Sequence, residues 1–435
     1  MTILRPALRA VDSLGHWSGL LSRPLSAERL IEIARRRARH EDLGDIPIAE
    51  PLERLLEACR AEASLSLVGR FALKWDSLRF LANLLDLAKA EQKTPAIAGE
   101  PITRPIFITG FPRSGTTFLH ELMLCDPANR APRVWETIFP YPPREDRDGP
   151  DRRVARVARQ LRMFGRLAPE FHGLHRISAT SPQECSEITA HSFRSLRFDT
   201  TYRIPSYRTW LESRRPGTEG HLPAYRMHRR FLQHLQHQHG ATRWVLKCPD
   251  HVFALDALRA VYPDAGLVFV HRDPARVLLS VARLTEVVRR PFTRHLDPME
   301  IGRGESARWH EGAQRMIAAT EDPRSAGGIC HVRYLDLIAD PAATVTALYR
   351  HFNIPEPDGL AAAVARFAAA EPNGGYGVHR YRTEDHGLDA DREREKFRPY
   401  LMHFDVAPEP AEAPRTTPPR GSSLRSRPAG LSRPA

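Results

Sequence analysis

The stretch FITGFPRSGTTF, residues 107–118, has the composition of a loop that holds an anion. Gly110 permits a sharp turn, and Gly115 lets the backbone approach a ligand closely. The backbone amides between them, with the positive end of the helix expected to follow, favour negative charge. Arg113 adds a planar donor that can bind an anion with two hydrogen bonds. The loop also carries three hydroxyl side chains: Ser114, Thr116 and Thr117.

The loop differs from that of a nucleotide triphosphatase in two ways. Such an enzyme places a lysine directly after the second glycine and an acidic residue after a second strand, where it holds magnesium. Here Thr116 stands at the lysine position, and the apolar run GLVFVH is followed by Arg272. An arginine at that point indicates a second phosphate on the ligand. The sequence therefore predicts a ligand with phosphates at two places and no metal; the alternative is a small-molecule kinase that uses ATP.

GFPRSGTTF followed by VFVHRDPARVLLSVARL resembles the sulfotransferases that use 3′-phosphoadenosine 5′-phosphosulfate (PAPS). In that family the first motif binds the 5′-phosphosulfate, which implies this role for Arg113, Ser114, Gly115, Thr116 and Thr117. The second motif holds the 3′-phosphate through an arginine and a serine, which implies Arg272 and Ser280. The segment VRYLDLIADP is similar to one whose tyrosine lies by the adenosine, which implies Tyr334, although Leu335 replaces the usual acidic residue.

The resemblance also implies catalytic roles, because sulfuryl transfer needs cations on the transferring group and a base for the acceptor proton. Arg113 is the first cation, and Lys247 in LKCPD is similar to a family lysine that contacts the sulfuryl group. Glu136 in RVWETIFP matches the context of the base in tyrosylprotein sulfotransferases, apart from a small gap in its spacing from the loop. Glu184 in SPQECSE is a second candidate, either as base or as a residue that orients Arg113 or Lys247.

Two further features of the family leave alternatives open. Its cytosolic members use a histidine as base, so His191 and His251 stay as candidates. The family also has a phosphate-binding loop near its C-terminus, and NGGYGVHRYR offers glycines and cations for one, with Arg380 or Arg382 as the ligand. Overall the resemblance covers about residues 105–405 and is greatest to a bacterial branch distantly akin to the tyrosylprotein enzymes.

The elements that position these residues alternate between short apolar strands and helices. The runs PIFITG, RWVLKC, GLVFVH and GICHVRY are each followed by a helical pattern. Such alternation is typical of an α/β fold with a parallel sheet buried on both faces. Ligands of these sheets bind beyond the carboxyl ends of the strands, which is where the candidate residues stand. The resemblance implies the P-loop-like, three-layer version of this fold.

Three segments are expected. Residues 1–100 have helical patterns and are predicted to pack on the core as an N-terminal helical segment, in which Gly44 can end the helix of AERLIEIARRRARHEDLG. Residues 101–405 form the sulfotransferase α/β domain. Residues 406–435 are rich in Pro, Ser, Ala and Arg, with almost no large apolar side chain, and are predicted to be disordered.

Composition bounds the partners. The formal net charge of +12 suits nucleic acid, an anionic membrane or a small polyanion. The arginines are spread along the whole chain, so we expect no nucleic-acid partner and leave contact with a membrane surface open. Five cysteines without a C-x-x-C favour reduced thiols in a cytoplasm. The clustered His234, His237 and His239 are expected to form a solvated helix end, because helical spacing brings only two of them to one face.

The acceptor is left as a hydroxyl-bearing small molecule, lipid or glycan, or a peptide tyrosine. Residues between Trp135 and Trp244 are expected to supply most of the surface that meets it. A non-enzymatic alternative is a basic protein that keeps the scaffold and binds polyanions in general. The oligomeric state is left open.

Overall fold

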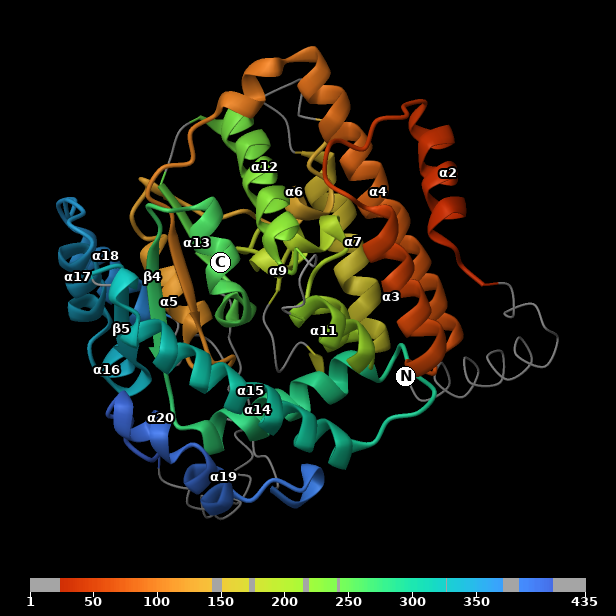
Figure 1. The fold of residues 1–435 in the computed structure, drawn as a ribbon. Helices are drawn as coiled ribbons and strands as arrows, with labels where there is room; N and C mark the ends of the chain where they lie inside the picture. Colours follow the sequence, from red (N-terminus) through yellow and green to blue (C-terminus); the bar gives the residue numbers. More distant parts are fainter. Residues whose placement is uncertain are drawn as a thin grey trace, which may run out of the picture.

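A computed structural model describes residues 24–142, 151–171, 177–213, 219–240, 243–325, 327–370 and 383–409. Its centre is a parallel sheet of five strands in the order β2-β3-β1-β4-β5, surrounded by helices (Figure 1). The strands are β1 (Ile106–Gly110), β2 (Asn129–Arg130), β3 (Arg243–Lys247), β4 (Gly266–His271) and β5 (Ile329–Arg333). The predicted α/β fold and four predicted strands are confirmed. The two-residue β2 was missed because Asn-Arg has no strand pattern.

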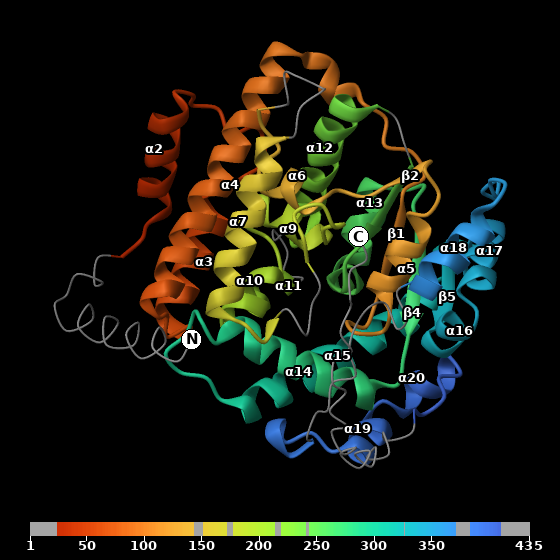
Figure 2. The same ribbon diagram turned by 180° about the vertical axis from the view of Figure 1, so that it is seen from behind.

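The sheet is covered on both faces because successive strand residues point to opposite sides. Ile106 and Ile108 of β1 lie in one apolar cluster, together with the helices of residues 116–123 and 334–370. Phe107 lies in the other cluster, together with the helices of residues 222–239 and 255–321 and with the N-terminal helices. This alternation produces the three layers, and Figure 2 shows the same arrangement from behind.

The helices that carry the site follow the strands. They are α5 (Thr116–Met123) after β1, α13 (Leu255–Val261) after β3, α14 (Pro274–Arg289) and α15 (Pro298–Glu321) after β4, and α16 (Tyr334–Ala339), α17 (Pro341–His351) and α18 (Leu360–Ala370) after β5. The connection from β1 to β3 holds α6 (Val134–Ile138), α7 (Arg152–Leu167), α9 (Cys185–Thr189), α10 (Arg197–Thr201), α11 (Pro205–Glu212) and α12 (Leu222–His239). Near the C-terminus stand α19 (Ala390–Lys396) and α20 (Arg398–His403).

The N-terminal part consists of α2 (Ala27–Ala38), α3 (Ala49–Glu62) and α4 (Leu67–Lys93), whose apolar residues share a core cluster with the sheet. The expected helix end at Gly44 is wrong, because α2 ends at Ala38, six residues earlier. Arg39 takes a left-handed conformation with φ of 50°, and its N–H donates to the carbonyl of Arg35. Among the described helices, none has both the length and the low polarity needed to cross a bilayer.

The predicted disordered tail begins too early. Val406 is buried in the main core cluster, and Glu409 makes hydrogen bonds to the body of the protein. Val406 packs in the core because its side chain is apolar, and Glu409 is held by an ion pair with Arg272. Residues 410–435 lie outside the described residues, so disorder there stays a prediction.

Gly110 is expected to be essential to the junction of strand and loop. Its φ is +119°, and a Cβ at this position would lie 2.4 Å from the carbonyl oxygen of Val270. Backbone strain and overlap together predict that Gly110→Ala lowers the free energy of unfolding by about 3 kcal/mol, measured by urea denaturation. The control is Gly99→Ala, where nothing lies within 4 Å and a change below about 0.5 kcal/mol is expected. Equal stability of the two variants would contradict the assignment.

Candidate active site at the carboxyl ends of the strands

The parallel register brings the sequence-predicted residues to one edge of the sheet. Gly110 at the end of β1 pairs with Val270 of β4, so the loop after β1 starts beside Arg272. On the other side of β1, Lys247 is the last residue of β3. Tyr334 directly follows β5, which pairs with β4. Four segments that are far apart in the sequence therefore meet beyond the strand ends.

The loop has the shape of an anion cradle. Gly115, with φ of +93°, is the N-cap of α5, so the free amides of the first helical turn face the loop. The Ser114 hydroxyl is buried and donates to the carbonyl of Phe111 over 2.6 Å. Thr116 is also buried, whereas Thr117 is half-buried. Ser114 thus stabilises the loop conformation, and the amides and Thr117 are the groups nearest to solvent.

Arg272 connects the loop to the later strands. Its Nη1 donates to the carbonyl of Arg113 over 2.8 Å, and its guanidinium carbon lies 3.8 Å from the ring centroid of Tyr334. Arg113 in turn donates from Nε to the Ser280 hydroxyl over 2.9 Å. A Cβ on Gly115 would meet the Tyr334 ring at 2.9 Å. The structure therefore brings together the residues expected to hold both ends of the nucleotide.

The edge of the Arg272 guanidinium that faces away from Arg113 binds the carboxylate of Glu409. Its Nε and Nη2 donate to the two carboxylate oxygens of Glu409 over 2.7 and 2.8 Å. The backbone N–H of Glu409 donates to Asp273 over 2.9 Å, and Arg394 donates to the Glu409 carbonyl over 2.9 Å. A bidentate carboxylate occupies the geometry that a phosphate takes on an arginine. This edge is therefore built for an anion.

Lys247 and Glu184 form the second charged feature of the site. They make an ion pair in which the lysine side chain is 4% exposed and the glutamate side chain is 32% exposed. Beside them lies a small hollow whose walls come from α9 and the segment after it, from the start of α12 and from the turn after β3. Its lining includes Cys185, Ser186, Tyr225, Cys248, Asp250 and His251. Glu184 is thus a half-exposed carboxylate next to a nearly buried cation and a polar hollow.

The two histidine candidates are held differently. His191 is in the core: its Nε2 lies 3.0 Å from the Asn83 amide, and burial lowers its pKa to about 3. His251 lines the hollow, where its Nδ1 lies 2.5 Å from the Tyr225 hydroxyl. Burial, with the nearby His228 and Lys247, holds the pKa of His251 well below its usual range. His251 is therefore a neutral group beside the ion pair, and His191 is too deep to reach a ligand.

Glu136 is not brought to this site. It is 2% exposed and accepts hydrogen bonds from the Arg130 side chain and, over 2.8 Å, from the Arg133 backbone. His239 lies 3.2 Å away. Burial alone would raise the pKa of Glu136, but these partners together lower it. Because Arg130 is in β2 and His239 ends α12, the carboxylate lies toward the amino end of β3, opposite Lys247.

The local reason is that Glu136 caps a helix. The Glu136 carboxylate accepts from the backbone N–H of Arg133, the residue before the first turn of α6, which is the glutamate's half of a capping box. A glutamate three residues after a helix start is a sequence signal for such a cap, and it competes with the interpretation as a base.

Two contributing residues, Glu409 and Arg394, were missed, and two candidates fall outside the described residues. Arg394 donates to the buried carboxylate of Asp273 over 2.8 Å and so borders the site of Arg272. Its dense charged neighbourhood predicts only an exposed helix, so no sequence signal separates it. Arg380 and the alternative Arg382 lie outside the described residues.

The expected solvated helix end holds for His237 and His239, which are exposed in the last turn of α12, but not for His234. His234 is buried and bonds to Tyr141 and Glu91, which gives it two polar partners inside the protein. His237 pairs with Glu100. Each histidine thus contacts a different carboxylate, since His239 lies beside Glu136. Among the described residues, no group of three or more His, Cys, Asp or Glu side chains is arranged to hold a metal ion.

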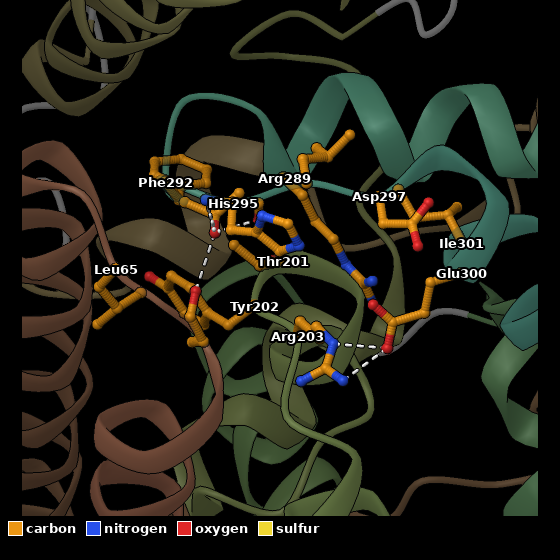
Figure 3. A pocket seen from close by; sticks show the side chains of 13 residues that line it. Leu65, Thr201, Tyr202, Arg203, Arg289, Phe292, His295, Asp297, Glu300 and Ile301 are labelled. Carbon is orange, nitrogen blue, oxygen red and sulfur yellow. Dashed lines mark hydrogen bonds and ion pairs between the residues drawn. The ribbon is translucent and has the colours of Figure 1, made fainter. Parts of the chain in front are cut away.

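A separate pocket lies at the far end of α14 (Figure 3). Arg289 in its wall is nine residues from Ser280, which is roughly 13 Å along a helix. An ion pair between Arg203 and Glu300 crosses its rim, with Phe292 and His295 on the other side. This pocket is therefore distinct from the anion loop.

Comparisons with known proteins identify the family and agree with the fold. Residues 105–358 match a family described as the sulfotransferase family. The structure of sulfotransferase STF1 from Mycobacterium tuberculosis has a TM-score of 0.70 and 30% sequence identity, covering 86% of this chain and 98% of that one. The structure of STF9 from Mycobacterium avium has a TM-score of 0.74 and 24% identity, covering 88% of this chain and 97% of that one, and shares the fold.

A curated relative is also similar. The omega-hydroxy-beta-dihydromenaquinone-9 sulfotransferase Stf3 of Mycobacterium tuberculosis is 25% identical over 270 residues. The match covers 58% of this chain and 63% of that relative, so the chain spans less than two thirds of its length.

The surroundings of Glu136 predict a structural role. Glu136→Gln leaves the positive charge of Arg130 buried without its carboxylate, and we expect a loss of about 3 kcal/mol in the free energy of unfolding. Urea denaturation measures this loss. The matched control is Glu321→Gln, whose side chain is 64% exposed in a 3.7 Å contact with His403 and should change stability by less than about 0.5 kcal/mol. A Glu136→Gln protein as stable as the control would refute the structural role.

Proposed function

The chain belongs to the sulfotransferase family, and we propose that it moves the sulfuryl group of PAPS to a hydroxyl of a lipid-like acceptor. The observation that carries the proposal is the meeting of Arg113, Ser280, Arg272 and Tyr334 with the Lys247–Glu184 pair at one edge of the sheet. This arrangement supports one anion site at the loop and another at Arg272, as a nucleotide with phosphates at its 5′ and 3′ positions requires.

We assign the chemistry to three side chains. The acceptor hydroxyl gives its proton to the Glu184 carboxylate while its oxygen attacks sulfur, and the bond from sulfur to the 5′-phosphate oxygen breaks. Adenosine 3′,5′-bisphosphate leaves. Lys247 and Arg113 stabilise negative charge on the sulfuryl and leaving oxygens, as preorganised cations do in related phosphoryl transfers.

Glu184 is preferred to Glu136 as base because of position. A base must reach the acceptor proton directly or through one water. Glu184 is half-exposed beside the hollow near Lys247, whereas Glu136 is buried toward the other end of β3. The neutral His251 in the same hollow is the second candidate.

The acceptor class is inferred from a relative and from the hollow. The name of the Mycobacterium tuberculosis relative says that it acts on a hydroxylated menaquinone, a lipid-like molecule with a terminal hydroxyl. The hollow beside Glu184 combines apolar and hydroxyl side chains with Arg194 and Asp250, and its apolar part suits such a group. The five cysteines, none of them in a disulfide, support the expectation of a cytoplasmic location.

The test of this function is calorimetric titration with adenosine 3′,5′-bisphosphate, in parallel with ATP and magnesium. We expect binding of the bisphosphate and little binding of ATP. Arg272→Ala should weaken the bisphosphate at least 10-fold, since a hydrogen-bonded charged contact contributes about 1.5–3 kcal/mol. It should affect adenosine 5′-phosphosulfate far less. Binding of ATP alone would support the kinase alternative, and an equal loss for both nucleotides would reject the role of Arg272.

The contact of Arg272 with Glu409 sharpens this test. The nucleotide must replace the Glu409 carboxylate, so Glu409→Ala should tighten bisphosphate binding by about 10-fold. The matched control is Glu395→Ala, because that exposed carboxylate contacts Arg398 and lies away from Arg272. Unchanged or weaker binding by the Glu409 variant would show that the 3′-phosphate does not use this edge of Arg272.

Glu184→Gln should separate catalysis from binding. Because the variant lacks the proton acceptor, we expect its turnover to fall by a factor of about 100 or more, while its bisphosphate affinity stays within about twofold. Both are measured with PAPS and a hydroxylated lipid acceptor. Glu136→Gln is the matched comparison, and at a temperature where it is folded it should keep its turnover. Retained turnover in the Glu184 variant would transfer the role to His251.

A further inference from the structure

Helix α7 has a face made almost entirely of arginines. Its exposed residues include Arg152, Arg156, Arg159, Arg162, Met163 and Arg166. At 3.6 residues per turn these six fall within an arc of about 120°. We call these six residues the basic face. Met163, at 61% exposure, gives the face an apolar centre.

The opposite face fixes the helix to the protein. Val157 is buried with Val134, Trp135 and Ala179, and other apolar residues of α7 pack on the same cluster. Near the end of the helix the Phe164 ring stacks on Phe292, with centroids 6.1 Å apart. The basic face is therefore held in a defined orientation and is not part of a loose charged segment.

The arginines of the basic face carry charges that the described part of the chain does not neutralise. The sequence of α7 contains no acidic residue, and no ion pair of these five arginines is found among the described residues. Arg153 provides a contrast, because it bonds to Asp151 and to the carbonyls of Phe139 and Pro140. The guanidinium carbon of Arg156 lies 3.9 Å from the centroid of the Phe139 ring, a contact that supplies no negative charge.

We propose that the basic face docks the protein on an anionic lipid surface. Helices that lie on membranes combine arginine or lysine with exposed apolar side chains in this way. The neighbouring α4 adds Phe71 and Trp75, at 66% and 45% exposure, on either side of Lys74. Aromatic residues of this kind lie at membrane–water boundaries. Both views show α4 and α7 side by side (Figures 1 and 2).

Helices α4 and α7 are connected through contacts with Phe292. The carbonyl of Phe292, whose ring meets Phe164 of α7, accepts a hydrogen bond from the N–H of Ser66 at the start of α4. Phe292 also lines the pocket of Figure 3. The start of α4, the end of α7 and this pocket thus share one residue.

The position of α7 relates the docking surface to the site. Its apolar face covers α6 and residues 177–179, and the chain reaches Glu184 five residues later. Docking through α7 would therefore place the layer that carries the proposed base against the lipid. This inference rests on the proposed lipid-like acceptor, whose hydroxyl would otherwise have to leave the membrane.

The test is co-sedimentation of the full chain with vesicles of phosphatidylcholine, with or without phosphatidylglycerol. Each basic residue near an anionic surface contributes about a fivefold factor in partitioning. Changing Arg159, Arg162 and Arg166 together to Gln should therefore lower binding to the anionic vesicles roughly 100-fold. The control changes Arg29, Arg36 and Arg37 of α2, three exposed arginines, to Gln. It removes the same charge and should bind nearly as the unaltered protein does. Binding should also fall as salt rises.

Three results would overturn the proposal: no preference for anionic vesicles, equal losses in the two triple variants, or α7-dependent binding to a short DNA duplex in place of vesicles. Bisphosphate titration of the same variants keeps the two proposals apart. Normal nucleotide binding with no vesicle binding rejects the docking surface alone, whereas absent nucleotide binding rejects the proposed function.

Discussion

The contacts of one guanidinium group hold the site together. Arg272 follows β4 and meets the Arg113 carbonyl in the loop after β1, the Tyr334 ring after β5 and the Glu409 carboxylate near the end of the described chain. Arginine suits this position because it offers planar, directional donors along its edge and a face that stacks on an aromatic ring. Removing it would separate four segments at once.

The same contacts compensate the charge of Arg272. A largely buried cation needs a partner, since an unpaired buried charge is costly. Glu409 supplies that partner with the two-point geometry of a phosphate, and Asp273 and Arg394 hold its backbone. An anion that binds this edge of Arg272 would have to displace the Glu409 carboxylate.

Charged residues at the two ends of the strands have different surroundings. At the carboxyl ends, Lys247 and Glu184 form a pair that borders a hollow. At the amino ends, Glu136 is surrounded by Arg130, the Arg133 backbone and His239, and closes a helix start. Both glutamates form ion pairs, but the Glu184 side chain is 32% exposed and that of Glu136 only 2%. The two glutamates differ in the exposure of their side chains and in the end of β3 near which they lie.

The sequence by itself determined the α/β fold, four of the five strands and the loop with its companions, because strand periodicity, glycine positions and the arginine after β4 are local signals. It was also enough to pair Arg272, Ser280 and Tyr334 with that loop through the family resemblance. Only the tertiary structure showed that Glu136 and Glu184 lie in different surroundings, since a glutamate that caps a helix and a glutamate beside a lysine look alike until the strand register places them. Glu409 and Arg394 depended on the same step: their contacts with Arg272 and Asp273 span more than 100 residues, and no local pattern encodes a contact of that range.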